Sequence, residues 1–101
     1  MTTLPPFKLV PEPMNDEALE AMQRNPSVDP EIGTRHRLGG QPDFMQQDEI
    51  PTCQYCHKPM TFYAQLDAVG HASEYDIADA GLIYVFLCFD DFEAQAIVHS
   101  G

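Results

Sequence analysis

Three cysteines and one aspartate have a spacing that is typical of a zinc site. Cys53 and Cys56 are separated by two residues in the stretch CQYC, and Cys88 and Asp91 repeat this spacing in CFDD, with 31 residues between the pairs. Two intervening residues let both side chains of a tight turn reach one ion, and two such turns supply four tetrahedral ligands. Because aspartate oxygen also ligates zinc, the pattern predicts one structural zinc ion held by these four residues.

The same residues allow other interpretations. His57 is a further candidate ligand, although it follows Cys56 directly and would have to turn back. A redox Cys-x-x-Cys has a helix behind it that lowers the pKa of the first thiol, whereas Pro59 and a strand-like run follow here. A third interpretation is a turn that has lost its metal, with Cys88 as a small buried apolar residue. Catalysis by a cysteine needs a histidine that is positioned to activate the thiol, and nothing in the sequence positions any of the four: His36, His57, His71 and His99.

Short strands are the elements that must position the two cysteine pairs. The run MTFYAQLDA from Met60 follows the first pair, and LIYVFLC, residues 82–88, leads into the second. Both are rich in aromatic and β-branched residues, which favour strands. A short strand before Gly39-Gly40 and a last strand from Ala94 complete the prediction. We expect a mainly β (α+β) fold with three or four antiparallel strands and a pair of zinc-knuckle-like turns, within a single small domain at residues 15–101.

The N-terminal region predicts an arm and one short helix. Prolines at positions 5, 6, 11 and 13 favour an extended proline-rich arm over residues 1–14, outside any packed element. Asn15 is the expected N-cap of the following helix, where Asp16 and Glu17 suit the positive end of the helix dipole. Asn25-Pro26 should end this helix.

Charge limits the class of partner. Sixteen Asp and Glu face five Lys and Arg, which gives a formal net charge of −11. Such a surface repels nucleic-acid phosphates and anionic membranes, whereas it attracts a basic protein. The start of the chain lacks the pattern of a signal peptide, and no apolar run is long enough to span a bilayer. We therefore expect a cytoplasmic protein with reduced or metal-bound cysteines.

Two groups of polar residues lie outside the cysteine pattern. Gln65 and Asp67 alternate with Ala64 and Leu66, so they are expected on the outer or loop-facing side of their strand. The basic cluster at residues 35–37 is expected to pair with the chain's own acids.

Four segments, in order, resemble a known family. HRLGGQPDFMQ, CQYCHKPMTFYAQLD, DAGLIYVFLC and AIVHS are similar to the C-terminal half of the YwqG-like proteins, and more distantly to the C-terminal domain of programmed cell death protein 2. The resemblance covers residues 36–100. It implies a mostly β domain with Cys53, Cys56 and Cys88 at knuckle positions, and with Asp91 where the family tends to have a fourth cysteine. The family has no established activity, and some members look like accessory or immunity proteins of toxin systems.

These observations favour a non-enzymatic, acidic protein-binding module with a structural zinc ion, for example an immunity or accessory protein that binds a basic partner. A thiol-redox factor or enzyme using Cys53 and Cys56 is one alternative, and a structural remnant without a ligand is another. An open edge on a small sheet would also allow a homo-oligomer.

Overall fold

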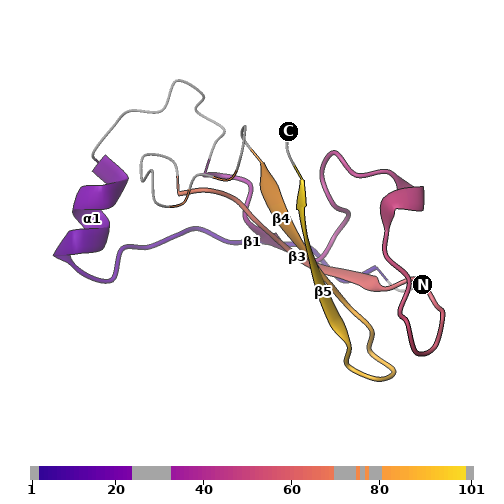
Figure 1. The fold of residues 1–101 in the computed structure, drawn as a ribbon. Coiled ribbons are helices and arrows are strands. Elements are labelled where there is room, and N and C mark those ends of the chain that lie inside the picture. The colour runs from indigo at the N-terminus through magenta and orange to yellow at the C-terminus, as the bar shows by residue number, and fades with distance from the viewer. Residues whose placement is uncertain (1–2, 24–32, 70–74, 76, 78–80, 100–101) are drawn as a thin grey trace.

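The chain forms one five-stranded antiparallel sheet in which the strand order follows the sequence order, β1-β2-β3-β4-β5 (Figure 1). The structure is a computed structural model, and it describes residues 3–23, 33–69, 75, 77 and 81–99. The strands are β1 (Phe7–Lys8), β2 (Arg37–Leu38), β3 (Thr61–Leu66), β4 (Leu82–Leu87) and β5 (Ala94–His99). One helix, α1 (Asp16–Gln23), and one 3-10 turn, η1 (Gln47–Glu49), complete the described elements. The predicted small antiparallel sheet with one short helix is confirmed, although it has five strands where three or four were expected.

The hydrophobic core lies on one face of the central strands. β4 alternates strictly between buried and half-buried residues, and its buried members are Leu82, Tyr84 and Phe86. Phe62 of β3 packs edge-on against both aromatic rings, with centroids 6.3 Å from Tyr84 and 5.7 Å from Phe86. Such edge-to-face pairs add to the stabilisation that burial of the rings provides. Three apolar side chains of the segment before β3 pack against this cluster, namely Met45, Ile50 and Met60.

A β-bulge in β3 changes which of its residues face the core. Phe62 pairs with Phe86 and Ala64 with Val85, so Tyr63 is the extra residue between two registered pairs. An extra residue reverses the alternation of side chains beyond it. Gln65 therefore pairs with Tyr84 on the core face, and it is fully buried. Of the two positions expected for Gln65 and Asp67, the outer side of the strand is wrong, because 0% and 4% of their surface is exposed. Both side chains instead face loops, since Gln65 bonds to Asp43 and Asp67 to Gly33.

The proline-rich segment is partly incorporated into the sheet. Phe7 pairs with Leu38 and Lys8 with Arg37, so β1 forms one edge of the sheet instead of belonging to a free arm. The backbone approach is close at Gly39, where an added Cβ would lie 2.4 Å from the Pro5 carbonyl oxygen. Gly39 also has a φ of +68°, which glycine adopts without steric cost. The N-terminal segment therefore meets the sheet at a position where the backbone needs glycine.

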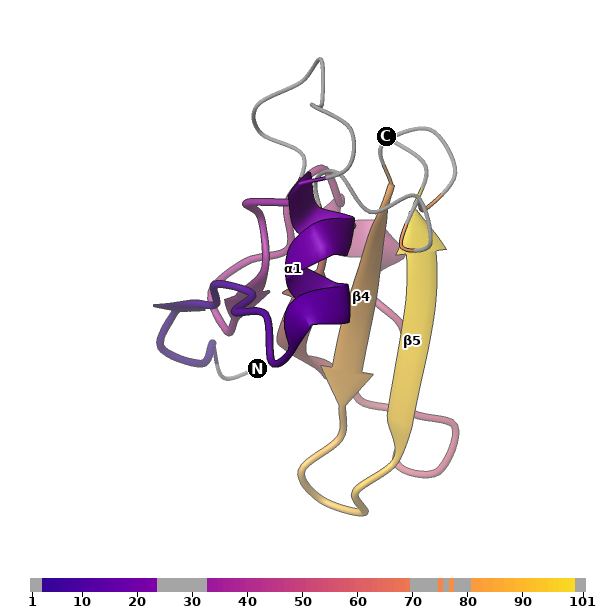
Figure 2. The same ribbon diagram turned by 90° about the vertical axis from the view of Figure 1, so that its left-hand side faces the viewer.

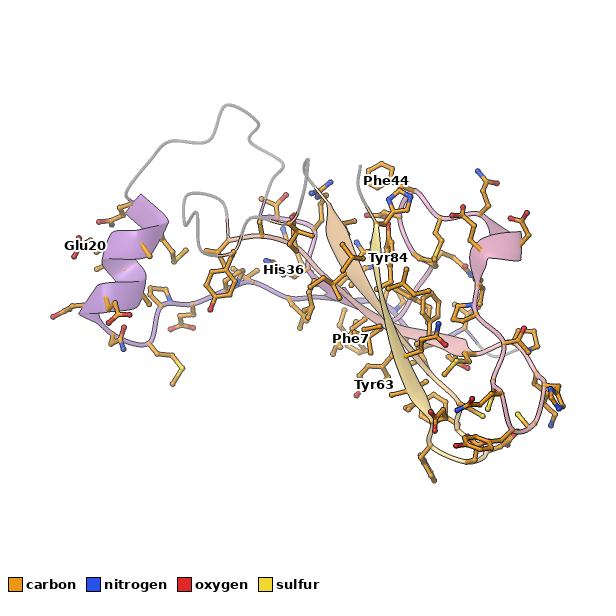
Figure 3. The ribbon with its side chains drawn as sticks, in the orientation of Figure 1. Phe7, Glu20, His36, Phe44, Tyr63 and Tyr84 are labelled. Carbon is orange, nitrogen blue, oxygen red and sulfur yellow. The ribbon has the colours of Figure 1, made fainter. Side chains whose placement is uncertain are left out.

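Helix α1 begins as the sequence predicts. The Asn15 side-chain oxygen accepts a hydrogen bond from the Ala18 N–H at 2.9 Å, which is N-cap geometry. None of the helix residues is buried. Figure 3 shows why: Glu20 on α1 lies far from Tyr84 in the sheet, with the extended segment after β1 between them. The described helices include none that is long and apolar enough to cross a membrane.

Some sequence-based interpretations concern residues that the structure does not describe. His71 and most of the acidic loop at residues 70–81 lie outside the described residues, as does the predicted helix end at Asn25-Pro26.

Candidate metal centre

The two predicted ligand pairs lie in two turns with the same backbone structure. In the first turn, the His57 N–H donates to the Cys53 carbonyl at 2.9 Å, and the Cys53 N–H donates to the Lys58 carbonyl at 2.9 Å. In the second, the Phe92 N–H donates to the Cys88 carbonyl at 2.8 Å, and the Cys88 N–H donates to the Glu93 carbonyl at 2.9 Å. The fifth residue of each turn, counted from its cysteine, has a left-handed backbone conformation. These residues are His57, with a φ of 61°, and Phe92, with a φ of 60°.

This repetition makes Asp91 the structural counterpart of Cys56. Each of these residues is the fourth of its turn, three positions after the cysteine that opens it. The first turn leads into β3, and the second joins β4 to β5. Because Thr61 of β3 pairs with Leu87 of β4, the two turns meet at the same end of the sheet.

The four ligand atoms are close enough to surround one ion. The sulfur atoms of Cys53, Cys56 and Cys88 and a carboxylate oxygen of Asp91 all lie within 4.8 Å of one another. Tetrahedral zinc with bonds of usual length separates two sulfurs by about 3.8 Å, and a sulfur and an oxygen by about 3.5 Å. The Cys56 and Cys88 sulfurs are 3.6 Å apart. The Cys53 sulfur lies 3.2 and 3.5 Å from the two Asp91 oxygens. The donor set thus fits a tetrahedral metal ion.

His57 is not part of this group. The described residues contain one cluster of His, Cys, Asp and Glu that could hold a metal ion, and it consists of Cys53, Cys56, Cys88 and Asp91. His57 instead occupies the left-handed position of the first turn and is exposed. Of the two residues considered for the fourth ligand, the geometry favours Asp91.

The pKa values of the two thiols in the first turn are shifted in opposite directions. The Cys56 N–H acts to lower the pKa of the Cys53 thiol, but burial and the hydrogen bond from this thiol to Asp91 outweigh it and raise the pKa to about 11. The same bond from Cys53 lowers the pKa of the Asp91 carboxyl. The pKa of Cys56 is lowered, chiefly by a hydrogen bond from the Lys58 N–H. Cys56 is therefore more readily deprotonated for a metal than Cys53.

The site is buried on the cysteine side and exposed on the Asp91 side. Cys53 and Cys88 are buried, Cys56 is half-buried, and Asp91 is exposed. The exposed Lys58 amino group lies 3.3 Å from the Asp90 carboxylate and links the two turns at the surface. A cavity of about 510 Å³ adjoins the site, lined by Leu4, Lys58, Pro59, Thr61, Cys88, Phe89 and Asp90. Solvent therefore reaches the site from the Asp91 side.

A buried polar cluster on the core face was missed by the sequence analysis. The Gln65 amide nitrogen donates to the Arg35 carbonyl at 2.8 Å and to the Asp43 carboxylate at 2.9 Å, and its oxygen accepts from the Asp43 N–H at 3.1 Å. The Tyr84 hydroxyl donates to the Asp43 carbonyl. These bonds attach the loop after β2 to the centre of the sheet. Gln65, followed by Asp67 two residues later, was the available signal in a largely apolar run, but the inward orientation of Gln65 follows from the bulge at Tyr63.

Asp67 anchors a second part of this cluster. Its carboxylate accepts two hydrogen bonds from the Arg35 guanidinium, at 2.9 and 3.0 Å, and others from the N–H groups of Gly33 and Ala68. Burial acts to raise the pKa of Asp67, but the guanidinium and the N–H groups outweigh it, so the pKa is lowered. Arg37 pairs with Asp43 at 3.3 Å. The expected pairing of the basic cluster with the chain's own acids is thus present in the structure.

Comparison with protein-family models, with curated proteins and with solved structures finds no match to this chain. The resemblance to the YwqG-like proteins therefore stays a prediction.

Proposed function

We propose that the protein is a non-enzymatic binding module whose sheet is held together by one structural zinc ion. The observation that carries the proposal is the convergence of Cys53, Cys56, Cys88 and Asp91 from two turns of identical backbone structure. Thiolate ligands favour zinc over magnesium or calcium. With four protein ligands the coordination is complete, which is the arrangement of structural sites and not of catalytic ones.

The surroundings of the first turn support a structural role over a redox role. A strand and not a helix follows Cys56, since β3 begins at Thr61. A reactive disulfide motif needs a thiol of lowered pKa at its first cysteine, whereas the pKa of Cys53 is raised to about 11. Cys53 is also almost fully buried, with 1% of its surface exposed.

The metal content of the protein, purified without a metal-affinity step, tests this proposal. We expect about one zinc ion per chain by elemental mass spectrometry. Cys53→Ser should lose the ion together with stability, and Asp91→Ala should bind it more weakly. His57→Ala is the matched control, because His57 lies in the same turn and is not a ligand, so this variant should retain the ion. Zinc loss in His57→Ala but not in Asp91→Ala would refute the assignment of the fourth ligand.

We further propose that the module binds a basic protein, as an immunity or accessory protein would do by covering a basic functional surface. The net charge of −11 supports this, because opposite charge accelerates and orients association. Three acids follow closely in the turn between β4 and β5: Asp90, Asp91 and Glu93. Of these, Asp91 belongs to the metal centre, so Asp90 and Glu93 remain to contact a partner.

Affinity capture with the zinc-loaded chain at low and high salt tests the second part of the proposal. We expect a basic protein that is retained at low salt and released at high salt. Neutralising Asp90 and Glu93 should weaken its retention, whereas the matched neutralisation of Asp16 and Glu17 on α1 should not. If no specific protein is retained at low salt, the binding function is refuted while the zinc site stands.

A further inference from the structure

The two edges of the sheet are built in opposite ways. β1 has only two residues, one of them Lys8, and prolines flank it on both sides. Short length, lysine and proline are features that prevent an edge strand from pairing with another chain. β5 has six residues, AQAIVH, without proline, glycine, lysine, arginine or an acid. No described residue pairs with its outer side, and Figure 2 shows it as the outermost strand.

The register of β4 and β5 shows which backbone groups point outward from this open edge. The Cys88 N–H donates to the Glu93 carbonyl, so these residues form a hydrogen-bonded pair at the start of the ladder. Bonded and non-bonded pairs alternate along an antiparallel ladder. Continuing the observed register, Gln95, Ile97 and His99 bond to β4. The N–H and C=O groups of the intervening residues, Ala94, Ala96 and Val98, therefore point away from the sheet.

We propose that two copies of the chain pair through β5, antiparallel to each other and about a two-fold axis at Ala96. In this register Ala96 lies opposite Ala96 of the second copy, and Ala94 lies opposite Val98 of the second copy. Every outward N–H and C=O group of the three residues then has a partner. The two sheets become one continuous sheet, and the edges that remain are the two short β1 strands.

Side chains across the axis are complementary in hydrogen bonding and in size. Directly opposite residues lie on the same face of an antiparallel pair, so Glu93 faces His99 of the second copy at both ends of the interface. Their Cβ atoms would be about 4.5–5.5 Å apart, which brings the carboxylate within reach of the imidazole. Gln95 faces Ile97, and no like charges oppose each other. Small Ala94 opposite the exposed Val98 leaves room for the larger side chain.

Salt distinguishes this pairing from binding of a basic partner on the same edge. Each copy carries a net charge of −11, so the two copies repel each other at long range. Screening by salt reduces that repulsion, and dimerisation should therefore strengthen as the salt concentration rises. Association with a basic protein should weaken under the same change.

Sedimentation equilibrium of the zinc-loaded chain, across the micromolar to millimolar range and at low and high salt, tests the proposal. We expect the mass to rise from 11.3 kDa to twice that value with increasing concentration, and at lower concentration when salt is high. Ala96→Pro should remain monomeric throughout. Because the Ala96 N–H points away from β4, proline there leaves the β4–β5 ladder intact, and unchanged circular dichroism and zinc content would verify this. Phe7→Ala, at the opposite edge, is the control that should still dimerise.

A charge exchange tests the register independently of proline. Glu93→Lys should weaken dimerisation at least several-fold, because lysine cannot accept the hydrogen bond that a carboxylate accepts from the His99 imidazole. Glu93→Lys combined with His99→Glu should restore dimerisation, because the lysine then faces a carboxylate. A wild-type chain that stays monomeric at every concentration would overturn the proposal. So would an Ala96→Pro variant that dimerises like the wild type, or a double variant that dimerises no better than Glu93→Lys.

Discussion

Replacing Gln65 with leucine would remove a buried amide that joins the loop after β2 to the sheet. The two side chains have similar volumes, so the substitution leaves no large cavity and tests the hydrogen bonds themselves. Gln65 donates to the Arg35 carbonyl and the Asp43 carboxylate and accepts from the Asp43 N–H. All three bonds are lost in Gln65→Leu, and their partners stay partly buried.

The expected loss of stability follows from these three bonds. Each neutral bond contributes about 1 kcal/mol, and the bond to the charged Asp43 contributes about 1.5–3 kcal/mol. Burying leucine in place of an amide recovers roughly 1–2 kcal/mol. The net decrease in the free energy of unfolding is therefore about 1.5–4 kcal/mol. For a chain of this length, that corresponds to a decrease in Tm of roughly 6–30 °C.

Denaturant unfolding of the zinc-loaded protein, followed by circular dichroism, measures this loss. Gln46→Leu is the matched control, because Gln46 is an exposed residue near the same loop, and its replacement should change stability by less than about 0.5 kcal/mol. If the two variants are equally stable, then the bonds of Gln65 do not hold the loop to the sheet, and the role given to the β3 bulge is wrong.

Three further predictions concern the metal centre and the buried ion pair. Removing zinc with a chelator should lower the Tm of the wild type but not of Cys53→Ser, and an unchanged Tm would contradict a structural role. Free zinc at about 100 times its Kd should stabilise the wild type by about 2.7 kcal/mol, as measured by calorimetry. Asp91→Cys should tighten zinc binding at least about tenfold in competition with a chromophoric chelator, because thiolate is the softer ligand; weaker binding would contradict the position assigned to residue 91. The lowered pKa of Asp67 means that its ionised form stabilises the fold above the unfolded-state pKa of about 3.9, and that this contribution is lost as pH falls through the lower folded-state value. Asp67→Asn should therefore lower the free energy of unfolding by about 3 kcal/mol at neutral pH and make it less dependent on pH in the acid range. If the pH dependence of unfolding is unaltered in this variant, then Asp67 is not the group that causes it.

Local signals in the sequence were sufficient for the turns and the helix start. Cys53 and Cys56, and Cys88 and Asp91, are brought together by short turns and by two strands that are adjacent in the sheet, so spacing alone placed them correctly. The N-cap at Asn15 likewise depends on residues within one helical turn.

Features that depend on distant partners were not predictable in the same way. The inward orientation of Gln65 arises from one extra residue, Tyr63, and no residue type in MTFYAQLDA marks the bulge. β1 forms because Phe7 meets Leu38 across 30 intervening residues, and the prolines around it conceal a strand of only two residues.

The division of the metal centre between two turns has a consequence for the order of folding. Each turn closes through bonds between residues at most five positions apart, so each half of the site can form early and independently. The halves meet only when β3 and β4 pair in the observed register, after the 15-residue connection at positions 67–81 has closed. A shift of this register by two residues would move one pair of ligands by roughly 7 Å and leave zinc with two protein ligands. Tight zinc binding therefore reports correct strand registry, and the ion selects the native pairing over its slipped alternatives.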